Sequence, residues 1–247
     1  MDLVSVIIPY YNKKKFINKT INSAVNQSYK HIEIVIVYDD ENIDDLKFIN
    51  EIKKKDKRIV IIQNQKKEGA GNSRNIGISN SNGKYIAFLD ADDTWEKNKL
   101  EKQIKFMDTN NLDISHTSYY IVDEKNTILG KRFAKNFFLL KELLKSCDIG
   151  LSTVVIKKEI INDEIKFPVL KTKEDFVLWL KLLENGKKIY AFNEYLTFWT
   201  KSKHSLSSST YQKILDGFRV YHKYMNFNFF KSLYFLFCLS INFILKK

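Results

Sequence analysis

Three aspartates stand within four residues of one another, at Asp90, Asp92 and Asp93. Carboxylates this close repel one another, so something must solvate or neutralise them. In a surface turn, water does this, and such acidic turns are commoner than metal sites. In a binding site, a divalent cation does it, because Mg²⁺ is held by one or two carboxylates together with the phosphates of a substrate. The three residues alone leave both interpretations open.

The acidic cluster follows an apolar run, Tyr85 to Leu89, that predicts a strand buried on both faces. The aspartates therefore lie at the carboxyl end of a strand, where open α/β sheets bind their ligands. Asp39 and Asp40 likewise follow an apolar run at residues 32–37. Two acidic strand ends in one chain favour a ligand site over a solvated turn.

Strands and helices alternate along the first half of the chain, which predicts βαβ units and a parallel sheet. The expected strands are 4–9, 32–37, 58–63, 85–89 and 114–122, with a strand-like stretch at 152–156, and the expected helices are 14–28, 44–55 and 97–110. The ligand edge of such a sheet collects the loops after the first, second and fourth strands. Tyr11, Asp39 and the aspartates of 90–93 are therefore expected to lie close together.

A glycine-bearing loop follows the third expected strand. Gly69 and Gly71 begin a G-x-G-x-x-G pattern, but Arg74 stands where the third glycine belongs, and a dinucleotide fold has this loop after its first strand. The pattern therefore argues against an NAD site. Asn72 or Ser73 is expected to cap a short helix here. Arg74 is either a ligand for a diphosphate or a base, or an ordinary surface arginine.

A second acidic pair, Glu174 and Asp175, opens an apolar run that predicts a helix packed on the sheet. Thr172 and Asp175 match a capping box, and stabilising the helix start is a sufficient structural role for both acids. A carboxylate at a helix start that faces a cleft serves equally well as a general base. The spacing alone does not decide between these roles.

The formal net charge of +12 raises the question of nucleic-acid binding. The lysine clusters 13–15, 53–55 and 66–67 lie in separate segments, and no aromatic-interleaved basic motif accompanies them. Nearly all of the cations are lysines, which hold planar phosphates less well than arginine. We therefore expect no nucleic-acid partner, and the basic surface suits an anionic membrane or an anionic sugar nucleotide at least as well.

The two cysteines, Cys147 and Cys238, form neither a C-x-x-C motif nor a disulfide framework, which indicates a reducing compartment. The N-terminus lacks the basic region of a signal peptide and enters a strand at once. We therefore expect a cytoplasmic protein.

The C-terminal stretch 226–245 is rich in Phe, Leu, Ile and Tyr, but polar residues interrupt it. Its uninterrupted apolar part is shorter than the roughly 20 residues that a spanning helix needs. One interpretation is a helix lying on the inner face of the cytoplasmic membrane, with the lysines near it facing anionic headgroups. The other is a helix packed on the domain or in a dimer interface.

In order and spacing, five stretches of the chain resemble the family 2 inverting glycosyltransferases of the GT-A fold. The stretches are 5–12, 34–40, 69–77, 83–95 and 174–179. The resemblance covers about residues 3 to 210, and the chain is most similar to the enzymes that build bacterial capsular polysaccharide, lipopolysaccharide O-chains or teichuronic acid. It implies an α/β fold of the nucleotide-diphospho-sugar transferase type, with a mostly parallel central sheet flanked by helices and a C-terminal helical extension.

The resemblance also implies a division of the chain. Residues 1–210 would form the glycosyltransferase domain, with 1–110 as its nucleotide-binding half and 111–210 as its acceptor side. Residues 211–247 would form a C-terminal helical segment, for which the membrane-surface and the packed interpretations both stay open.

Individual residues receive roles from the same resemblance. Asp92 would coordinate a Mn²⁺ or Mg²⁺ ion that bridges the donor diphosphate, and Asp175 would be the catalytic base. The implied nucleotide-binding residues are Pro9, Tyr11, Asp39, Arg74, Asp90 and Ala91. Asp39 would accept the N–H of uracil, so the expected donor is a UDP-sugar and the expected acceptor is a saccharide or lipid-linked glycan.

The chain departs from the family pattern after the second strand and near the end of the domain. Tyr38 replaces an acid of the usual Asp-Asp-Gly-Ser turn, and His204 is offset from the position where relatives often carry a histidine. The expected activity is a single inverting displacement. The alternative is a catalytically silent nucleotide-sugar-binding or scaffold subunit of a polysaccharide assembly complex. The joint presence of Asp90, Asp92 and Asp175 favours the enzyme, because a binding subunit has no need of a base.

Overall fold

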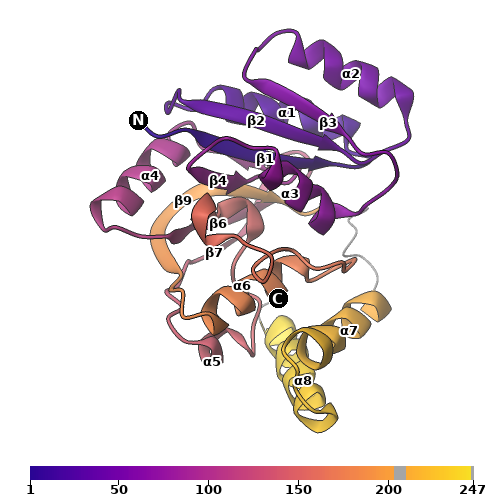
Figure 1. Cartoon of the computed structure of the whole chain (residues 1–247), viewed down its shortest axis with the longest axis vertical. Helices are drawn as coiled ribbons and strands as arrows, with labels where there is room; N and C mark the ends of the chain where they lie inside the picture. The colour runs from indigo at the N-terminus through magenta and orange to yellow at the C-terminus, as the bar shows by residue number, and fades with distance from the viewer. Residues whose placement is uncertain (203–209, 246–247) are drawn as a thin grey trace.

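The computed structural model describes residues 1–202 and 210–245, and within these residues a nine-stranded sheet forms the centre of the molecule (Figure 1). The strands are β1 (Val4–Tyr10), β2 (Ile32–Tyr38), β3 (Ile59–Gln63), β4 (Tyr85–Phe88), β5 (Thr94–Trp95), β6 (Ile114–Val122), β7 (Ile128–Arg132), β8 (Val155–Lys157) and β9 (Tyr190–Thr200). Their order is β3-β2-β1-β4-β8-β6-β9-β5, and β7 pairs with β6.

The first four strands in this order, β3, β2, β1 and β4, are all parallel. β8 is antiparallel to both β4 and β6, β9 runs parallel to β6, and β5 is antiparallel to β9. The expected α/β fold with a mostly parallel sheet flanked by helices is therefore confirmed, with the antiparallel pairs confined to the second half. The carboxyl ends of β1, β2 and β4 share one edge, as the sequence predicts.

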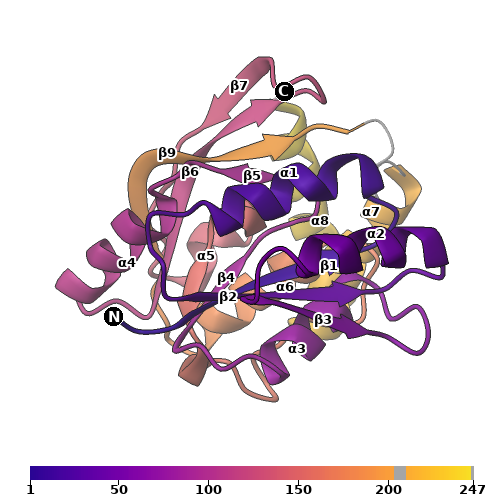
Figure 2. The ribbon, with the colours of Figure 1, turned by 90° about the horizontal axis from the view of Figure 1, so that it is seen from above.

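Helices cover both faces of the sheet (Figure 2). They are α1 (Lys14–Val25), α2 (Ile43–Lys53), α3 (Ala70–Ser79), α4 (Lys99–Thr109), α5 (Leu140–Leu143), α6 (Glu174–Glu184), α7 (Thr210–Arg219) and α8 (Phe229–Leu245). Alternation along β1 divides the core in two: Val6 and Ile8 pack with α1, α2 and α4, whereas Ile7 packs with α3 and α6. All four residues of β4 are buried, as a strand covered on both faces must be.

The predicted cap of the glycine-loop helix is wrong. α3 begins at Ala70, so Asn72 and Ser73 lie inside the helix instead of capping it. Gly69 has φ of 83°, a left-handed conformation that favours glycine, and no side chain caps this helix start. The loop is fixed by Asp39, whose carboxylate accepts hydrogen bonds from the backbone N–H of Glu68 and Gly69 at 2.7 Å.

The predicted capping box at the start of α6 is also wrong. Lys173 is the N-cap residue, with φ of 70°, and no side chain caps this helix. The N–H and hydroxyl of Thr172 both donate to Asp216 of α7 at 3.1 Å. Thr172 therefore joins two helices, and Asp175 is released from the capping role.

The strand-like stretch at 152–156 is only partly a strand. Leu151–Thr153 forms a 3₁₀ turn, and β8 begins at Val155. Ser152 therefore stands in a turn beside β4, where its hydroxyl reaches the residues that follow that strand.

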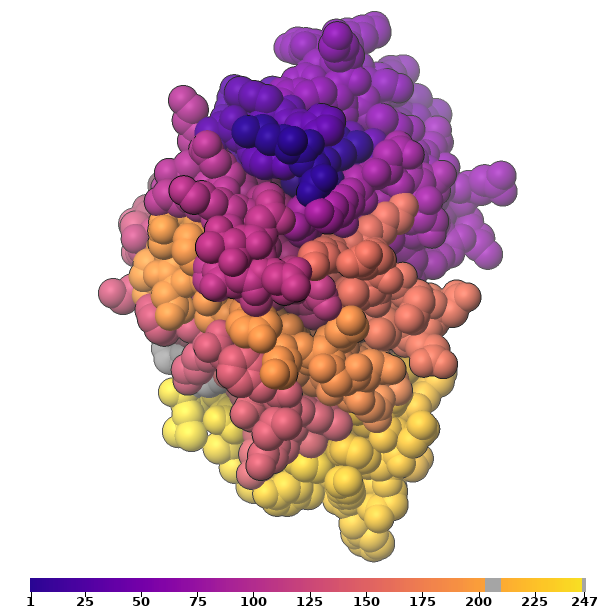
Figure 3. All heavy atoms as spheres, turned by 60° about the vertical axis from the view of Figure 1, so that its left-hand side comes forward, coloured from indigo at the N-terminus to yellow at the C-terminus, as the bar shows by residue number. Residues whose placement is uncertain are grey.

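The C-terminal residues form a helical hairpin at one end of the molecule, opposite the N-terminal half (Figures 1 and 3). α7 continues into a π-helical turn, Val220–Tyr224, and α8 packs back on both, burying Leu239 against the core. Gly217 permits the close approach, because a Cβ there would lie 2.9 Å from Leu236. Across the ranges 1–202 and 210–245, every helix is too short or too polar to cross a lipid bilayer.

Candidate active site

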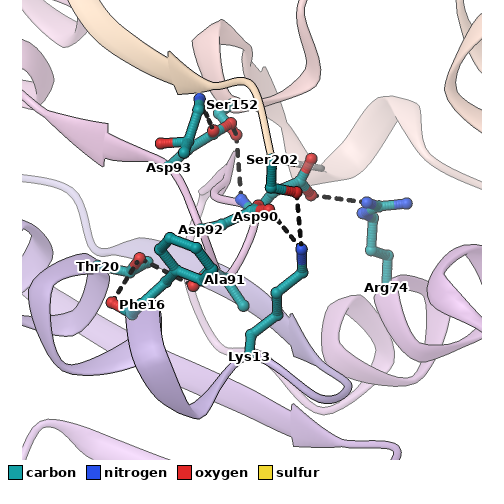
Figure 4. Close-up of polar contacts among 11 residues, drawn as sticks. Lys13, Phe16, Thr20, Arg74, Asp90, Ala91, Asp92, Asp93, Ser152 and Ser202 are labelled. Carbon is teal, nitrogen blue, oxygen red and sulfur yellow. Dashed lines mark hydrogen bonds and ion pairs between the residues drawn. The ribbon is translucent and has the colours of Figure 1, made fainter. Parts of the chain in front are cut away.

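The acidic turn after β4 is held by hydrogen bonds to two distant parts of the chain (Figure 4). The Ser152 hydroxyl donates to Asp93 at 2.6 Å and accepts from the backbone N–H of Asp90 at 3.0 Å. The Thr200 N–H donates to the other oxygen of Asp93 at 2.8 Å. Burial, with the neighbouring Asp92 and Asp90, raises the pKa of Asp93 well above its ordinary value. Asp93 therefore fixes the turn to the end of β9, and Asp90 and Asp92 are left for other contacts.

Arg74 of α3 bridges two carboxylates from different elements. Its Nη2 donates to Asp90 at 2.7 Å and its Nη1 to Glu174, the first residue of α6, at 2.8 Å. Burial opposes the charge of Arg74, but Asp90 and Glu174 together hold the pKa of the guanidinium above its ordinary value. Gly71 allows α6 to start this close, since a Cβ there would lie 3.3 Å from the Cβ of Glu174. The bridge places the start of α6 beside the acidic turn.

Asp175, the next residue of α6, therefore lies close enough to Asp90 for the two charges to interact. Its Oδ1 accepts the backbone N–H of Phe176 at 2.8 Å. Burial raises the pKa of Asp175, Lys173 and Arg74 oppose the rise, and the negative charge of Asp90 adds to it. A half-buried carboxylate with a raised pKa is more basic than an exposed one, which suits a general base.

Asp92 forms an ion pair with Lys13, from the loop between β1 and α1 (Figure 4). The Lys13 Nζ lies 2.6 Å from the Asp92 Oδ2, and the two side chains are 19% and 15% exposed. The ammonium also lies 3.4 Å from the hydroxyl of Ser202. Burial raises the pKa of Asp92 and Lys13 opposes the rise. This carboxylate therefore already stabilises a cation.

A metal ion at Asp92 would receive few ligands from the protein. Over the residues that the structure describes, no group of three or more His, Cys, Asp or Glu side chains is placed to hold an ion. Mg²⁺ commonly binds through one or two carboxylates, several waters and the phosphates of a substrate, and Mn²⁺ accepts the same hard oxygen ligands. A single carboxylate that already holds an ammonium fits such an ion when a diphosphate supplies further ligands.

Asp39 lies at the end of β2 and is 4% exposed. Besides the Glu68 and Gly69 N–H groups, it accepts a hydrogen bond from the Asn64 side chain at 2.7 Å. A carboxylate has about four acceptor positions, so one position remains for a ligand N–H. The neighbouring Tyr38, which replaces the usual acid, is buried and stacks on Tyr10 at 5.1 Å. Tyr38 is therefore a core residue, not a ligand-binding one.

The other predicted nucleotide residues also lie at this edge. Pro9 is half-buried near the end of β1. The Lys67 ammonium lies over the Tyr11 ring, 3.7 Å from the ring centroid. Ala91 is buried, and its carbonyl oxygen accepts the Thr20 hydroxyl of α1 at 3.0 Å. His204 lies outside the residues that the structure describes.

Residues 5–158, more than half of the chain, match the sequence model of Glycosyl transferase family 2. The chain belongs to this family. It is a glycosyltransferase, and the resemblance predicted from its motifs is confirmed.

Similar curated proteins support the same conclusion over a longer stretch. TuaG of Bacillus subtilis (strain 168), whose name provisionally assigns it to teichuronic acid biosynthesis as a glycosyltransferase, is 34% identical over 231 residues, which are 93% of this chain and 91% of TuaG. WfaP of Escherichia coli, a UDP-Glc:alpha-D-GlcNAc-diphosphoundecaprenol beta-1,3-glucosyltransferase, is 37% identical over 219 residues, 87% of this chain and 84% of WfaP.

Solved structures share the fold. The crystal structure of S. aureus TarS 1-349 in complex with UDP-GlcNAc has a TM-score of 0.73 and 24% identity, over 89% of this glycosyltransferase. The mannosyltransferase PcManGT from Pyrobaculum calidifontis, in complex with GDP-Man and Mn²⁺, has a TM-score of 0.69 and 12% identity over 91%. This chain spans 64% of the length of each.

The sequence did not predict the contacts that three residues make in the site. Lys13 appeared only as one of several scattered lysines, although it directly follows the loop that contains Tyr11. The sequence predicts either a helix start or a general base for Glu174, not an ion pair with Arg74, and Ser152 carries no local signal. The position of Lys13, one residue after a predicted ligand loop, is the signal that could have identified it.

Proposed function

We propose that this glycosyltransferase is metal-dependent and inverting, and that it moves a sugar from a UDP-sugar to a saccharide acceptor carried by a lipid diphosphate. The bridge from Asp90 through Arg74 to Glu174 supports this most, because it brings a candidate base at Asp175 beside the acidic turn. In this proposal residues 1–110 bind the nucleotide and 111–210 the acceptor.

Asp92 would hold a Mn²⁺ or Mg²⁺ ion, which when bound neutralises the charge that develops on the leaving diphosphate. Asp90, fixed by Arg74 and by the Ser152 hydroxyl, would face the ribose or sugar of the donor. Pro9, Tyr11 and Ala91 would line the nucleotide pocket. Arg74 would position the two carboxylates that it bridges, and its remaining N–H donors would contact the nucleotide.

Asp175 would accept the proton of the acceptor hydroxyl as that oxygen attacks the sugar. A hydroxyl has a very high pKa, so a carboxylate within hydrogen-bond reach must remove the proton during the attack. One displacement inverts the configuration at the anomeric carbon, and no covalent intermediate with the enzyme is required. The raised pKa of Asp175 makes it a stronger base.

The choice of a uracil nucleotide rests on Asp39 and on the relatives. One acceptor position of Asp39 remains for the N–H of a base, and the names of WfaP and of the TarS complex include UDP-linked sugars. A lipid-diphosphate acceptor is proposed because the name of WfaP specifies one.

Thermal shift against UDP and GDP, with and without Mn²⁺, tests this proposal. A ligand at 100 times its dissociation constant stabilises the native state by about 2.7 kcal/mol. We expect UDP with Mn²⁺ to raise the melting temperature in a concentration-dependent way, and UDP alone or GDP with Mn²⁺ to raise it less. No shift with any of these ligands would contradict the proposal.

We further propose that α8 contacts the inner face of the cytoplasmic membrane. Five of its apolar residues, spaced four and three residues apart, form one exposed stripe. They are Phe230, Tyr234, Phe237, Ile241 and Ile244, with exposed fractions of 82%, 52%, 65%, 38% and 66%. The Lys145 ammonium lies beside the Tyr234 ring of this stripe, and the Lys231 ammonium lies beside the Phe227 ring just before α8. An apolar stripe bordered by cations matches an anionic lipid surface.

The double substitution F230E/F237E should weaken binding to vesicles that contain phosphatidylglycerol by about tenfold or more, because two large apolar side chains no longer enter the lipid. Co-sedimentation measures the effect. Ile43→Glu is the matched control, since Ile43 is 67% exposed on α2, at the opposite end of the molecule (Figure 1).

Point substitutions are preferable to removal of α8, which would expose the core around Leu239. If the wild-type protein does not bind such vesicles, the membrane proposal is wrong. A dimer that F230E/F237E dissociates would instead assign the stripe to a second copy of the chain.

A further inference from the structure

The backbone of Lys13 is held in a fixed loop, and its long side chain reaches Asp92. The preceding Asn12 has φ of 49°, and its N–H donates to Asp40 at 2.6 Å, so the loop between β1 and α1 is held in place. Lys13 is the N-cap residue of α1 and its side chain makes no capping hydrogen bond. The ammonium is therefore positioned by Asp92, not by its own helix.

Lys13 contacts the same carboxylate, Asp92, that the proposed function gives to a metal ion. The Lys13 Nζ lies 2.6 Å from the Asp92 Oδ2, in a place where water has limited access to either group. A divalent cation held by the Asp92 carboxylate would share it with the ammonium, and two neighbouring cations repel strongly where screening is weak. The ammonium and the metal ion therefore compete for Asp92.

A nucleoside diphosphate would remove this competition, because its phosphate oxygens offer the ammonium another anionic partner. Lysine suits such an exchange, since its charge is carried on a flexible four-carbon stem with three rotatable donors. The Ser202 hydroxyl, 3.4 Å from the ammonium, is its second polar neighbour.

We propose that Lys13 is the counter-ion of Asp92 in the nucleotide-free enzyme and that it moves to the diphosphate when nucleotide and metal bind together. The inference rests on the proposed function. Its consequence is a thermodynamic coupling: metal alone binds weakly because it must displace Lys13, and the nucleotide makes the displacement favourable. Each ligand then raises the affinity for the other by the same factor.

Electron paramagnetic resonance of Mn²⁺ tests the coupling without any measurement of sugar transfer. Free and bound Mn²⁺ are counted during titration of the wild type and Lys13→Gln, each with no nucleotide, with UDP and with GDP. Without nucleotide, Lys13→Gln should bind Mn²⁺ about tenfold more tightly than the wild type, which lies within the usual range of coupling effects. With UDP, the wild type should gain more affinity for Mn²⁺ than Lys13→Gln does.

Two further variants serve as controls. Lys15→Gln removes the same charge from α1, where Lys15 pairs with Glu124 at 2.5 Å, and it should leave Mn²⁺ affinity unchanged. Lys13→Arg keeps a cation beside Asp92 and should restore weak nucleotide-free binding. Thermal melting of all the variants identifies any that fail to fold, and Lys13→Met, which removes the same charge, replaces Lys13→Gln if that variant does not fold.

The outcomes separate the inference from the function on which it rests. If UDP raises Mn²⁺ affinity in the wild type but Lys13→Gln binds nucleotide-free Mn²⁺ no more tightly, Lys13 is not the competing counter-ion. If Mn²⁺ binds no variant even with UDP or GDP present, the metal-dependent function is wrong, and the inference is overturned with it.

Discussion

Asp175→Asn should lower the rate of sugar transfer by about a thousandfold, within the range that a positioned general base contributes, while leaving nucleotide binding intact. Asparagine has nearly the same shape as aspartate but cannot accept the proton of the attacking hydroxyl. The bridge from Asp90 through Arg74 to Glu174 does not involve the Asp175 side chain, so the nucleotide half of the site should persist.

The stability of this variant should not fall at neutral pH. Burial raises the pKa of Asp175, so the folded protein favours its protonated form. The stability from this group is fully present below the unfolded pKa and is lost as the pH rises through the folded pKa. At neutral pH the ionised group therefore costs stability, and a neutral asparagine should melt at an equal or higher temperature.

The same direction of shift predicts the pH profile of the wild type. The base must be ionised, so transfer should fall as the pH is lowered through the pKa of Asp175, and this limb should lie above the ordinary aspartate value. Transfer and thermal shift with UDP and Mn²⁺ are measured together. Glu184→Gln is the control, because Glu184 is a half-exposed residue at the far end of the same helix. Normal turnover by Asp175→Asn would refute the assignment of the base.

Asp92→Asn should abolish the Mn²⁺-dependent part of UDP binding and reduce transfer by about a thousandfold, because electrostatic stabilisation of the leaving group contributes strongly to the rate of such reactions. A neutral amide oxygen is a weaker ligand for a hard cation than a carboxylate. The substitution also leaves the Lys13 ammonium without its 2.6 Å partner, so UDP binding without metal should be retained or strengthened.

Titration calorimetry of UDP at zero and saturating Mn²⁺ measures this effect. Asp163→Asn is the control, because its carboxylate is fully exposed and pairs with the neighbouring Lys166, far along the chain from the acidic turn. If Asp92→Asn and the wild type show the same response to Mn²⁺, the metal ion, if any, binds elsewhere.

The part of the fold that positions the site follows from local sequence. Short apolar runs such as Tyr85 to Leu89 favour buried strands, and the polar residues that end them then lie at the sheet edge. The helical pattern between the runs then requires parallel strands, which brings Asp39 and Asp90 to the same edge. These inferences depend on periodicity over several residues, which is the strongest signal that a sequence carries.

The helix starts were predicted wrongly because their stabilising partners are distant in sequence. Glu68 and Gly69 donate to Asp39, about 30 residues earlier, and Thr172 donates to Asp216, 44 residues later. A capping motif describes only what neighbouring residues offer. Tertiary contacts that satisfy the same groups better therefore override it.

The central contacts of the site also join residues that are far apart in the sequence. Lys13 meets Asp92 across 79 residues and Arg74 meets Glu174 across 100, and neither pair has a spacing that a pattern could detect. Arg74 left two interpretations open on sequence alone. The structure places its guanidinium between two carboxylates, so it is not an exposed surface arginine, and its contact with a nucleotide stays a prediction.

The most direct test of the proposed metal and base sites is an anomalous-difference map, recorded at the manganese edge, from a crystal of the wild-type protein grown with UDP and Mn²⁺. We expect one peak at about 2.1 Å from a carboxylate oxygen of Asp92 and from a diphosphate oxygen, with the Asp175 carboxylate facing the same bound nucleotide. Manganese bound away from Asp92, or a diphosphate that Asp175 does not face, would contradict these assignments.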